Sequence, residues 1–218
     1  MSKSSDVKSI VLAGLIAVGL FAQSMPSHAE GSETLTVAGG CFWCVEADFE
    51  KVRGVKEAIS GFAGGKAANP TYKQVTSGGT GHYEAVEITF DPSVVSAAQL
   101  LDLFFRSVDP TDAGGQFCDR GESYRTAIFA TSSQKQAAQD AKAKAQSDLG
   151  KQIVTPVLPA TKFYPADAYH QDYAKSGKVI LTRFGPKSKA NAYKAYREAC
   201  GRDERVKELW GSAAPFAD

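Results

Sequence analysis

The sequence AGGCFWCVEADFEKV, residues 38–52, places two cysteines at the start of a predicted helix. Cys41 follows a glycine turn at the end of a predicted strand, where backbone N–H groups and the helix dipole stabilise a thiolate. We therefore expect a lowered pKa for Cys41 and nucleophilic sulfur chemistry at this residue. Cys44 is three residues further along, so both sulfurs should face the same side of the helix.

The two aromatic residues between these cysteines have different predicted roles. Phe42 belongs to the apolar stripe of the helix and is expected to pack against the core. Trp43 shares its side of the helix with Glu46 and Glu50, where core packing does not account for a tryptophan. Because Trp43 is next to the nucleophile, we expect it to form the wall of a pocket for a small apolar group.

A glutamate on an apolar strand face could supply a proton. In EAVEITF, residues 84–90, strict alternation puts Glu84 on one face with Val86, Ile88 and Phe90. A carboxyl there loses hydration, so its pKa rises and it can act as a general acid at neutral pH. A glutamate at the end of a strand that turns into solvent is an equal alternative.

Further polar candidates lie in loops. Asp119 and Tyr124 belong to the glycine-containing loop CDRGESY, and Tyr72 lies in NPTYKQV. A turn-capping role for Asp119 and a core position for either tyrosine are open alternatives. His82 and His170 each stand alone in the sequence, which favours structural hydrogen bonding for both.

Periodicity and turn residues predict the element order β-α-β-β-α-β-α-β. This order indicates an α+β fold, in which one two-layer domain has helices packed on a mixed sheet, with a ferredoxin-like core and a long irregular C-terminal tail. Prolines in the last strand place it at an edge. The strands are expected within residues 33–40, 55–65, 84–92, 124–131 and 152–164, and the helices within 41–52, 93–109 and 132–149, with a short one near 190–200.

Residues 1–29 have the features of a cleaved signal peptide. Lys3 and Lys8 form a basic start, residues 10–22 are apolar but short for a membrane span, and a small-x-small site ends at Ala29. We expect export, to the periplasm, with an uncleaved anchor as the alternative. The sequence then divides into a domain at 30–198 and a tail at 199–218.

The charge balance excludes some partners. The formal net charge is +1, and the part that follows the leader is neutral, because Lys3, Lys8 and Asp6 are the leader's charged residues. A neutral chain argues against nucleic acid or an anionic membrane as a partner. The rest of the sequence has no segment suited to stable membrane insertion, and a monomer is expected.

Two alternatives use the cysteines differently. Structural zinc usually requires two close pairs of ligands, and only Cys41 and Cys44 form one, so a zinc-stabilised binding module is disfavoured and no metal is expected. Structural disulfides are possible in an exported protein. A thioredoxin-like CxxC dithiol oxidoreductase would also place such a pair after a strand.

Five sequence blocks in order resemble one enzyme family. GCFWCVE, NPTYKQV, SGGTGHYEAVEITFDP, CDRGESYRTAIF and YHQDY, which run from about Gly40 to Tyr173, resemble blocks of the A-type peptide methionine sulfoxide reductases. The resemblance implies reduction of the S epimer of methionine sulfoxide, free or in proteins, through a Cys41 sulfenic acid. It places the substrate methyl group against Phe42 and Trp43, with Glu84 protonating the oxygen. The hydrogen-bonding groups around that oxygen would be Tyr72, Asp119 and Tyr124.

The same resemblance implies recycling by a resolving thiol and a thioredoxin-like or other thiol donor, without metal or organic cofactor. Cys44 stands where many members have glycine, and Cys118 where several have asparagine. The stretch AKSGKV also lacks the Asn-Pro found in many members. These departures leave the resolving thiol open. Cys200, beside Gly201 in the tail, is our first choice, and Cys44 and Cys118 are equal alternatives.

Overall fold

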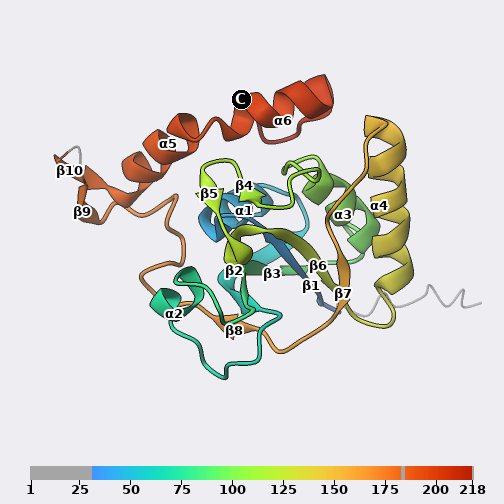
Figure 1. Ribbon diagram of the computed structural model, residues 1–218, viewed down its shortest axis with the longest axis horizontal. Coiled ribbons are helices and arrows are strands. Elements are labelled where there is room, and N and C mark those ends of the chain that lie inside the picture. The colour runs from blue at the N-terminus through green and yellow to red at the C-terminus, as the bar shows by residue number, and fades with distance from the viewer. Residues whose placement is uncertain (1–30, 183–184, 218) are drawn as a thin grey trace, which may run out of the picture.

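A mixed six-stranded sheet forms the centre of the protein (Figure 1). The computed structural model describes residues 31–182 and 185–217. The strands are β1 Glu33–Gly39, β2 Val55–Ala63, β3 Tyr83–Phe90, β6 Thr126–Ala130, β7 Val157–Pro159 and β8 Tyr164–Pro165. They lie in the order β7-β6-β1-β3-β2-β8, and the neighbours are antiparallel except for the parallel pair β6 and β7.

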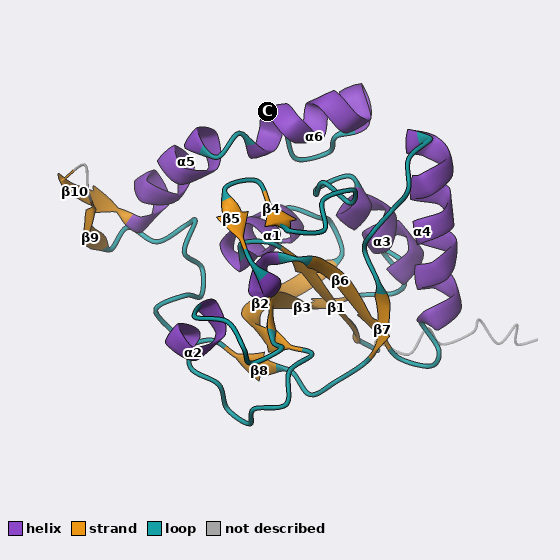
Figure 2. Cartoon of the chain, in the orientation of Figure 1, coloured by secondary structure: helices purple, strands orange, loops and turns teal. Residues whose placement is uncertain are grey.

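Helices and two small hairpins surround this sheet (Figure 2). The helices are α1 Phe42–Phe49, α2 Tyr72–Thr76, α3 Ala97–Phe105, α4 Lys135–Leu149, α5 Lys189–Ala199 and α6 Arg202–Trp210, with short 3-10 helices η1 Glu122–Tyr124 and η2 Gly211–Ala213. The hairpins are β4 Gly115–Gln116 with β5 Asp119–Arg120, and β9 Val179–Thr182 with β10 Gly185–Ser188. In Figure 1, α5 and α6 run along the top of the molecule, above α1 and the β4–β5 hairpin.

The predicted α+β class is confirmed, and so is the edge position of the proline-containing strand β7, which pairs with β6 alone in the sheet. Two helices were not predicted. Helix α2 forms between the strands predicted at 55–65 and 84–92, because Thr71 and Gln74 cap it reciprocally. Helix α6 lies in the tail, which was expected to be irregular.

The larger hydrophobic core lies between the sheet and its helices. The alternation predicted for β3 is confirmed, because Glu84, Val86, Ile88 and Phe90 are each at most 1% exposed. A smaller cluster that includes Ala85 fills the opposite face. Glu84 therefore sits at one end of an apolar row, and the sheet fixes its position.

A buried arginine holds the C-terminal segment on the domain. Arg202 is 1% exposed and donates to the carbonyl oxygens of Gly39, at 3.3 Å, and Ser107, at 2.8 Å. Arg205 adds an ion pair with Asp109 at 2.8 Å. Since Gly39 ends β1 just before α1, the tail contacts the turn that leads into the candidate nucleophile.

The predicted leader, residues 1–29, lies outside the described residues, and the boundary predicted between residues 198 and 199 falls within α5. Among the helices formed by residues 31–182 and 185–217, none combines the length and apolar character needed to cross a membrane.

Two leucine substitutions test this assignment of the core. Leu101→Ala should lower the free energy of unfolding by about 2–5 kcal/mol, since Leu101 is fully buried. Leu181→Ala makes the same chemical change at a residue that is 84% exposed, and should stay within about 0.5 kcal/mol of wild type. Urea denaturation measures both, and equal effects would contradict the described packing.

Candidate active site

A glycine turn places Cys41 at the start of α1. Gly40 has φ +80°, and a Cβ there would lie 2.5 Å from the Cβ of Gln116, so a side chain does not fit. Cys41 is the residue immediately before α1, and its carbonyl oxygen accepts a hydrogen bond from the Cys44 N–H at 3.1 Å. Both thiols are free and buried, at 7% and 1% exposure.

The predicted lowering of the Cys41 pKa is wrong for this state of the protein. Burial raises the pKa of Cys41 well above its ordinary value, and the hydrogen bond to Cys44 and the carboxyl of Glu84 act in the same direction. The pKa of Cys44 is lowered instead, because Cys41 donates to it and the guanidinium groups of Arg202 and Arg197 are near. In this pair a negative charge is therefore more stable on the Cys44 sulfur than on the Cys41 sulfur.

Glu84 is the buried acid that the alternation predicted. Its Oε2 accepts a hydrogen bond from the backbone N–H of Phe42 at 3.0 Å. Its Oε1 is buried and has no hydrogen-bond partner among the described residues. Burial raises the pKa of Glu84 to about 8, so the carboxyl holds a proton at neutral pH. A protonated Oε1 without a partner can donate to a bound ligand.

The structure also brings Tyr72, Tyr124 and Asp119 to this site. Tyr72 of α2 and Tyr124 of η1 are hydrogen bonded to each other, and their pKa values are raised by burial and then by Glu84. Both phenols therefore remain protonated donors. Asp119 of β5 influences the pKa of Cys41, and burial raises its own pKa. These three side chains come from separate segments and surround the nucleophile and the acid.

Aromatic rings form one wall of the site. The Phe42 ring centroid lies 6.1 Å from that of Trp43 and 6.0 Å from that of Tyr72. Trp43 stacks on Tyr173 with 3.7 Å between centroids, which accounts for a tryptophan off the core-facing stripe. His170 stacks on Tyr72 at 4.2 Å. This wall is suited to a small apolar group.

The two histidines differ from each other. The structural role predicted for His82 is confirmed, since its Nε2 lies 2.8 Å from the Ala67 carbonyl oxygen and its Nδ1 accepts from the Gly65 N–H at 3.1 Å. His170 is part of the aromatic wall, and its buried Nδ1 has no hydrogen-bond partner within the described chain. The sequence did not indicate this role, because stacking partners distant in the chain create it.

The face of α1 that was predicted to be polar is covered by the segment that contains Asp172 and Lys175. Glu46 is buried and accepts hydrogen bonds from the Ser60 hydroxyl and the Asp172 N–H, while burial raises its pKa to about 7. Glu46, Glu50 and Asp172 have the spacing of metal ligands. Glu50 forms an ion pair with Lys175 at 2.7 Å, and Glu46 already accepts the two hydrogen bonds named above. We therefore interpret these three acidic residues as a packing contact between α1 and the later segment, and not as a metal site.

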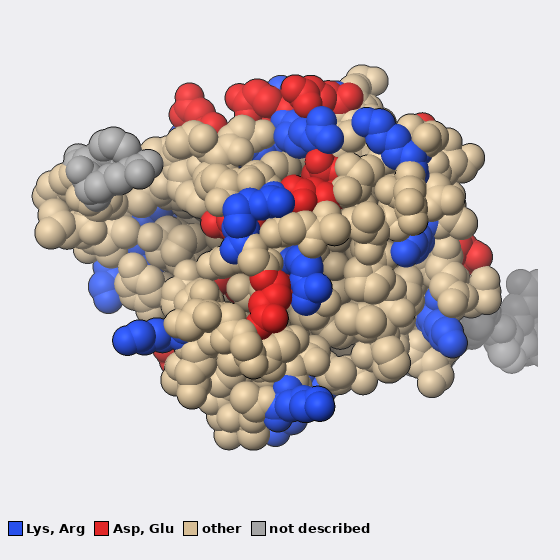
Figure 3. Space-filling model, in the orientation of Figure 1, with Lys and Arg blue, Asp and Glu red and all other residues tan. Residues whose placement is uncertain are grey.

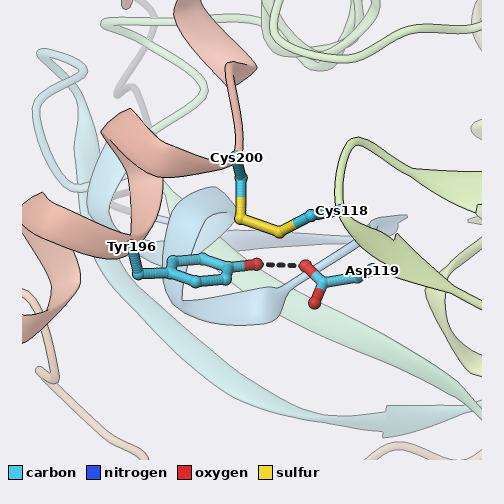
Figure 4. The surroundings of a disulfide bond; sticks show 4 residues. All are labelled: Cys118, Asp119, Tyr196 and Cys200. Atoms are coloured by element: carbon cyan, nitrogen blue, oxygen red, sulfur yellow. Dashed lines mark hydrogen bonds between the residues drawn. A yellow bond between two sulfur atoms is a disulfide. The ribbon is translucent and has the colours of Figure 1, made fainter. Parts of the chain in front are cut away.

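Cys118 and Cys200 are joined in a disulfide whose Cα atoms lie 5.1 Å apart. Figure 4 shows that the same contact joins Tyr196 to Asp119, with the Tyr196 hydroxyl donating to the carboxyl. Sequence reasoning missed Tyr196. Tyr196 and Cys200 are four residues apart in a segment predicted to be helical, so their side chains lie on the same face of the helix. This spacing could have indicated that Tyr196 lies near Cys200.

The comparisons with known proteins agree with this geometry. The family model described as peptide methionine sulfoxide reductase matches residues 33–211. Peptide methionine sulfoxide reductase MsrA 2 of Rhizobium meliloti is 49% identical over 193 residues, covering 87% of this chain and 89% of its own. The protein of the same name from Caulobacter vibrioides is 46% identical, with coverages of 93% and 97%. The solved methionine sulfoxide reductase A of Corynebacterium diphtheriae is 34% identical with a TM-score of 0.62, covering 67% of this chain and 75% of its own.

The protonation of Glu84 has a measurable consequence for stability. The folded carboxyl loses its proton at about pH 8, whereas an ordinary glutamate does so near 4.5, so the unfolded state binds fewer protons between these values. Wild type should therefore lose stability relative to Glu84→Gln as pH rises from about 5 to 8.

Urea denaturation of both proteins from pH 5 to 9 checks this expectation, because other titrating groups cancel in the difference. Glu33→Gln makes the same chemical change at an exposed position and is the matched control. If the difference in free energy of unfolding between wild type and Glu84→Gln stays constant with pH, the Glu84 carboxyl titrates alike in the folded and unfolded states. That result would contradict the expectation.

Proposed function

The chain belongs to the peptide methionine sulfoxide reductase family and reduces methionine S-sulfoxide, and we propose that Cys41 is its nucleophile and Glu84 its acid. The observation that carries this proposal is the contact of Phe42 with Glu84. The N–H next to Cys41 binds one carboxyl oxygen of Glu84, and the other oxygen is buried without a hydrogen-bond partner among the described residues. The carboxyl is close enough to Cys41 to raise the pKa of its thiol.

The substrate sulfoxide binds with its methyl group against Phe42 and Trp43. The Cys41 sulfur attacks the sulfoxide sulfur while Glu84 protonates the oxygen, and Tyr72 and Tyr124 donate hydrogen bonds to it. Methionine leaves and Cys41 becomes a sulfenic acid, so the substrate sulfur is reduced and the cysteine sulfur is oxidised by two electrons.

Cys44 supports this step and the one after it. Cys41 already donates to Cys44, so its proton can pass to the Cys44 thiolate as the Cys41 sulfur attacks. Cys44 then attacks the sulfenic acid, a disulfide forms and water leaves. The sequence favoured Cys200 for this role, but Cys200 is bonded to Cys118, whereas Cys44 lies within hydrogen-bonding reach of Cys41.

An external thioredoxin-like dithiol completes the cycle, and no metal or organic cofactor takes part. Free and protein-bound methionine sulfoxide both fit the proposal. A general dithiol oxidoreductase is less favoured, because the cysteines lie beside the buried acid Glu84 and an aromatic wall that suit a small sulfoxide group.

Turnover of the separated sulfoxide epimers of a blocked methionine tests the assignment of Cys41. With dithiothreitol, the protein should consume the S epimer alone, and Cys41→Ser should abolish this turnover because no nucleophile remains. Chromatography of both epimers over time measures the reaction, and circular dichroism verifies that the variant is folded. Residual turnover by folded Cys41→Ser, within a factor of ten of wild type, would remove Cys41 from its proposed role.

We also propose that residues 1–29 direct export to the periplasm and that cleavage occurs near Ala29. Lys3 and Lys8, the short apolar run and the small residues before Glu30 support this. The monomeric state expected from the sequence stays a prediction.

Expression of the full chain in a bacterium with a periplasm tests the export proposal. The periplasmic protein should begin near Glu30, and Ala29→Arg should retain the leader, since cleavage requires a small residue there. Fractionation and N-terminal sequencing measure both. Recovery of uncleaved wild type in the cytoplasm would contradict export.

A further inference from the structure

We propose that Glu46 positions the aromatic wall of the site by holding the segment that carries His170 and Tyr173. This inference deepens the proposed function and rests on it, because that reaction places the substrate methyl group against Phe42 and Trp43. Glu46 acts through this segment, so it is a positioning residue and not a catalytic one.

The aromatic wall comes from two parts of the chain that differ in their support. Phe42 and Trp43 belong to α1, whose backbone hydrogen bonds fix them. His170 and Tyr173 belong to residues 166–178, which form no helix or strand. Yet Tyr173 stacks on Trp43 with 3.7 Å between centroids, and His170 stacks on Trp43 at 5.7 Å. The position of these two rings therefore depends on contacts with the rest of the domain.

Glu46 supplies such a contact from α1. One of its carboxyl oxygens accepts a hydrogen bond from the backbone N–H of Asp172, and the other accepts from the hydroxyl of Ser60 in β2. Asp172 comes directly before Tyr173 and two residues after His170. A single side chain thus joins the helix, the sheet and the loop at a point between the two rings.

The backbone of Asp172 adopts a conformation that requires support. Its φ is +51°, in the left-handed region that non-glycine residues rarely adopt. A residue in this region persists where the surrounding contacts hold it. The hydrogen bond to Glu46 is one such contact. The neighbouring Gln171 side chain adds two more, because it accepts from the Ser60 N–H at 3.0 Å and donates to the Ser60 carbonyl oxygen at 2.9 Å.

The burial of the Glu46 carboxyl also points to a specific role. Acidic side chains gather on the surface along the edge where α5 and α6 run (Figure 3), whereas Glu46 is 2% exposed. A buried carboxyl loses its hydration, and only its hydrogen bonds offset that loss. An apolar residue would serve if the position had only to pack α1 against the sheet.

The two contacts of Glu46 depend on the shape of its side chain more than on its charge. The Ser60 hydroxyl can donate or accept, whereas the Asp172 N–H only donates. A glutamine amide can therefore donate to the hydroxyl and still accept from the N–H. An aspartate keeps the charge but is one methylene shorter, so it cannot reach both groups from α1.

Turnover of the S-sulfoxide of a blocked methionine, with dithiothreitol as reductant, tests this role. Because the methyl group does not react, the wall binds it alike in the ground and transition states, so a displaced wall raises KM and leaves kcat nearly unchanged. Glu46→Ala and Glu46→Asp should raise KM about tenfold, since the Asp172 N–H loses its partner, while Glu46→Gln should stay within about threefold of wild type. Glu57→Ala, at an exposed residue of β2, is the matched control and should leave KM unaltered.

The fluorescence of Trp43 reports on the wall itself. Trp43 and Trp210 are the two tryptophans of the chain, so Trp210→Phe leaves Trp43 as the emitting residue. In this background Glu46→Ala should shift the emission to longer wavelength, because Trp43 loses the stacked ring of Tyr173 and gains water. Glu46→Gln should leave the emission unchanged.

Three results would overturn the positioning role: a KM within about threefold of wild type for folded Glu46→Ala and Glu46→Asp, a tenfold rise of KM in Glu46→Gln, or an unshifted Trp43 emission in Glu46→Ala. If Glu46→Ala does not fold, Glu46→Asp and Glu46→Gln decide the question. Absence of turnover by wild type would instead overturn the proposed function, so the two failures are distinguishable.

Discussion

The hydrogen bond between the Phe42 backbone N–H and the Glu84 carboxyl joins the first turn of α1 to the central strand β3. One carboxyl oxygen is held there, and the carboxyl is close enough to Cys41 to raise the pKa of its thiol. Because β3 lies between β1 and β2, its position is set by two ladders of backbone hydrogen bonds. The distance between nucleophile and acid is thus a property of the sheet, and the surrounding tyrosines and aromatic wall are arranged around it.

The charge on the cysteine pair depends on the opposite side of α1. An eight-residue helix has little stability of its own, and its dipole does not offset the loss of hydration that burial imposes on a thiolate at Cys41. Arg197 of α5 pairs with buried Asp48 at 2.8 Å, and Arg202 lies close enough to favour the Cys44 thiolate. The tail therefore supplies the positive charge that the helix start does not.

The parts of the site that depend on local sequence pattern alone could be predicted from the sequence. Glu84 was found because strand alternation places a residue on a face before any partner is known. The pKa of Cys41 was predicted in the wrong direction, because burial and the carboxyls of Glu84 and Asp119 depend on packing between distant segments. Arg202 left no pattern at all, since its partners are backbone carbonyl oxygens, which every residue has.

The dependence of Cys44 on Arg197 and Arg202 has a consequence for how the protein is made. Asp48 and Cys44 belong to the first helix of the described chain and Cys41 lies just before it, whereas Arg197 follows Asp48 by 149 residues. Until that later part of the chain has been synthesised, the thiols exist without their compensating charges and without the cover that buries them. The reactive centre is therefore completed only when α5 and α6 have been synthesised and have packed onto the domain.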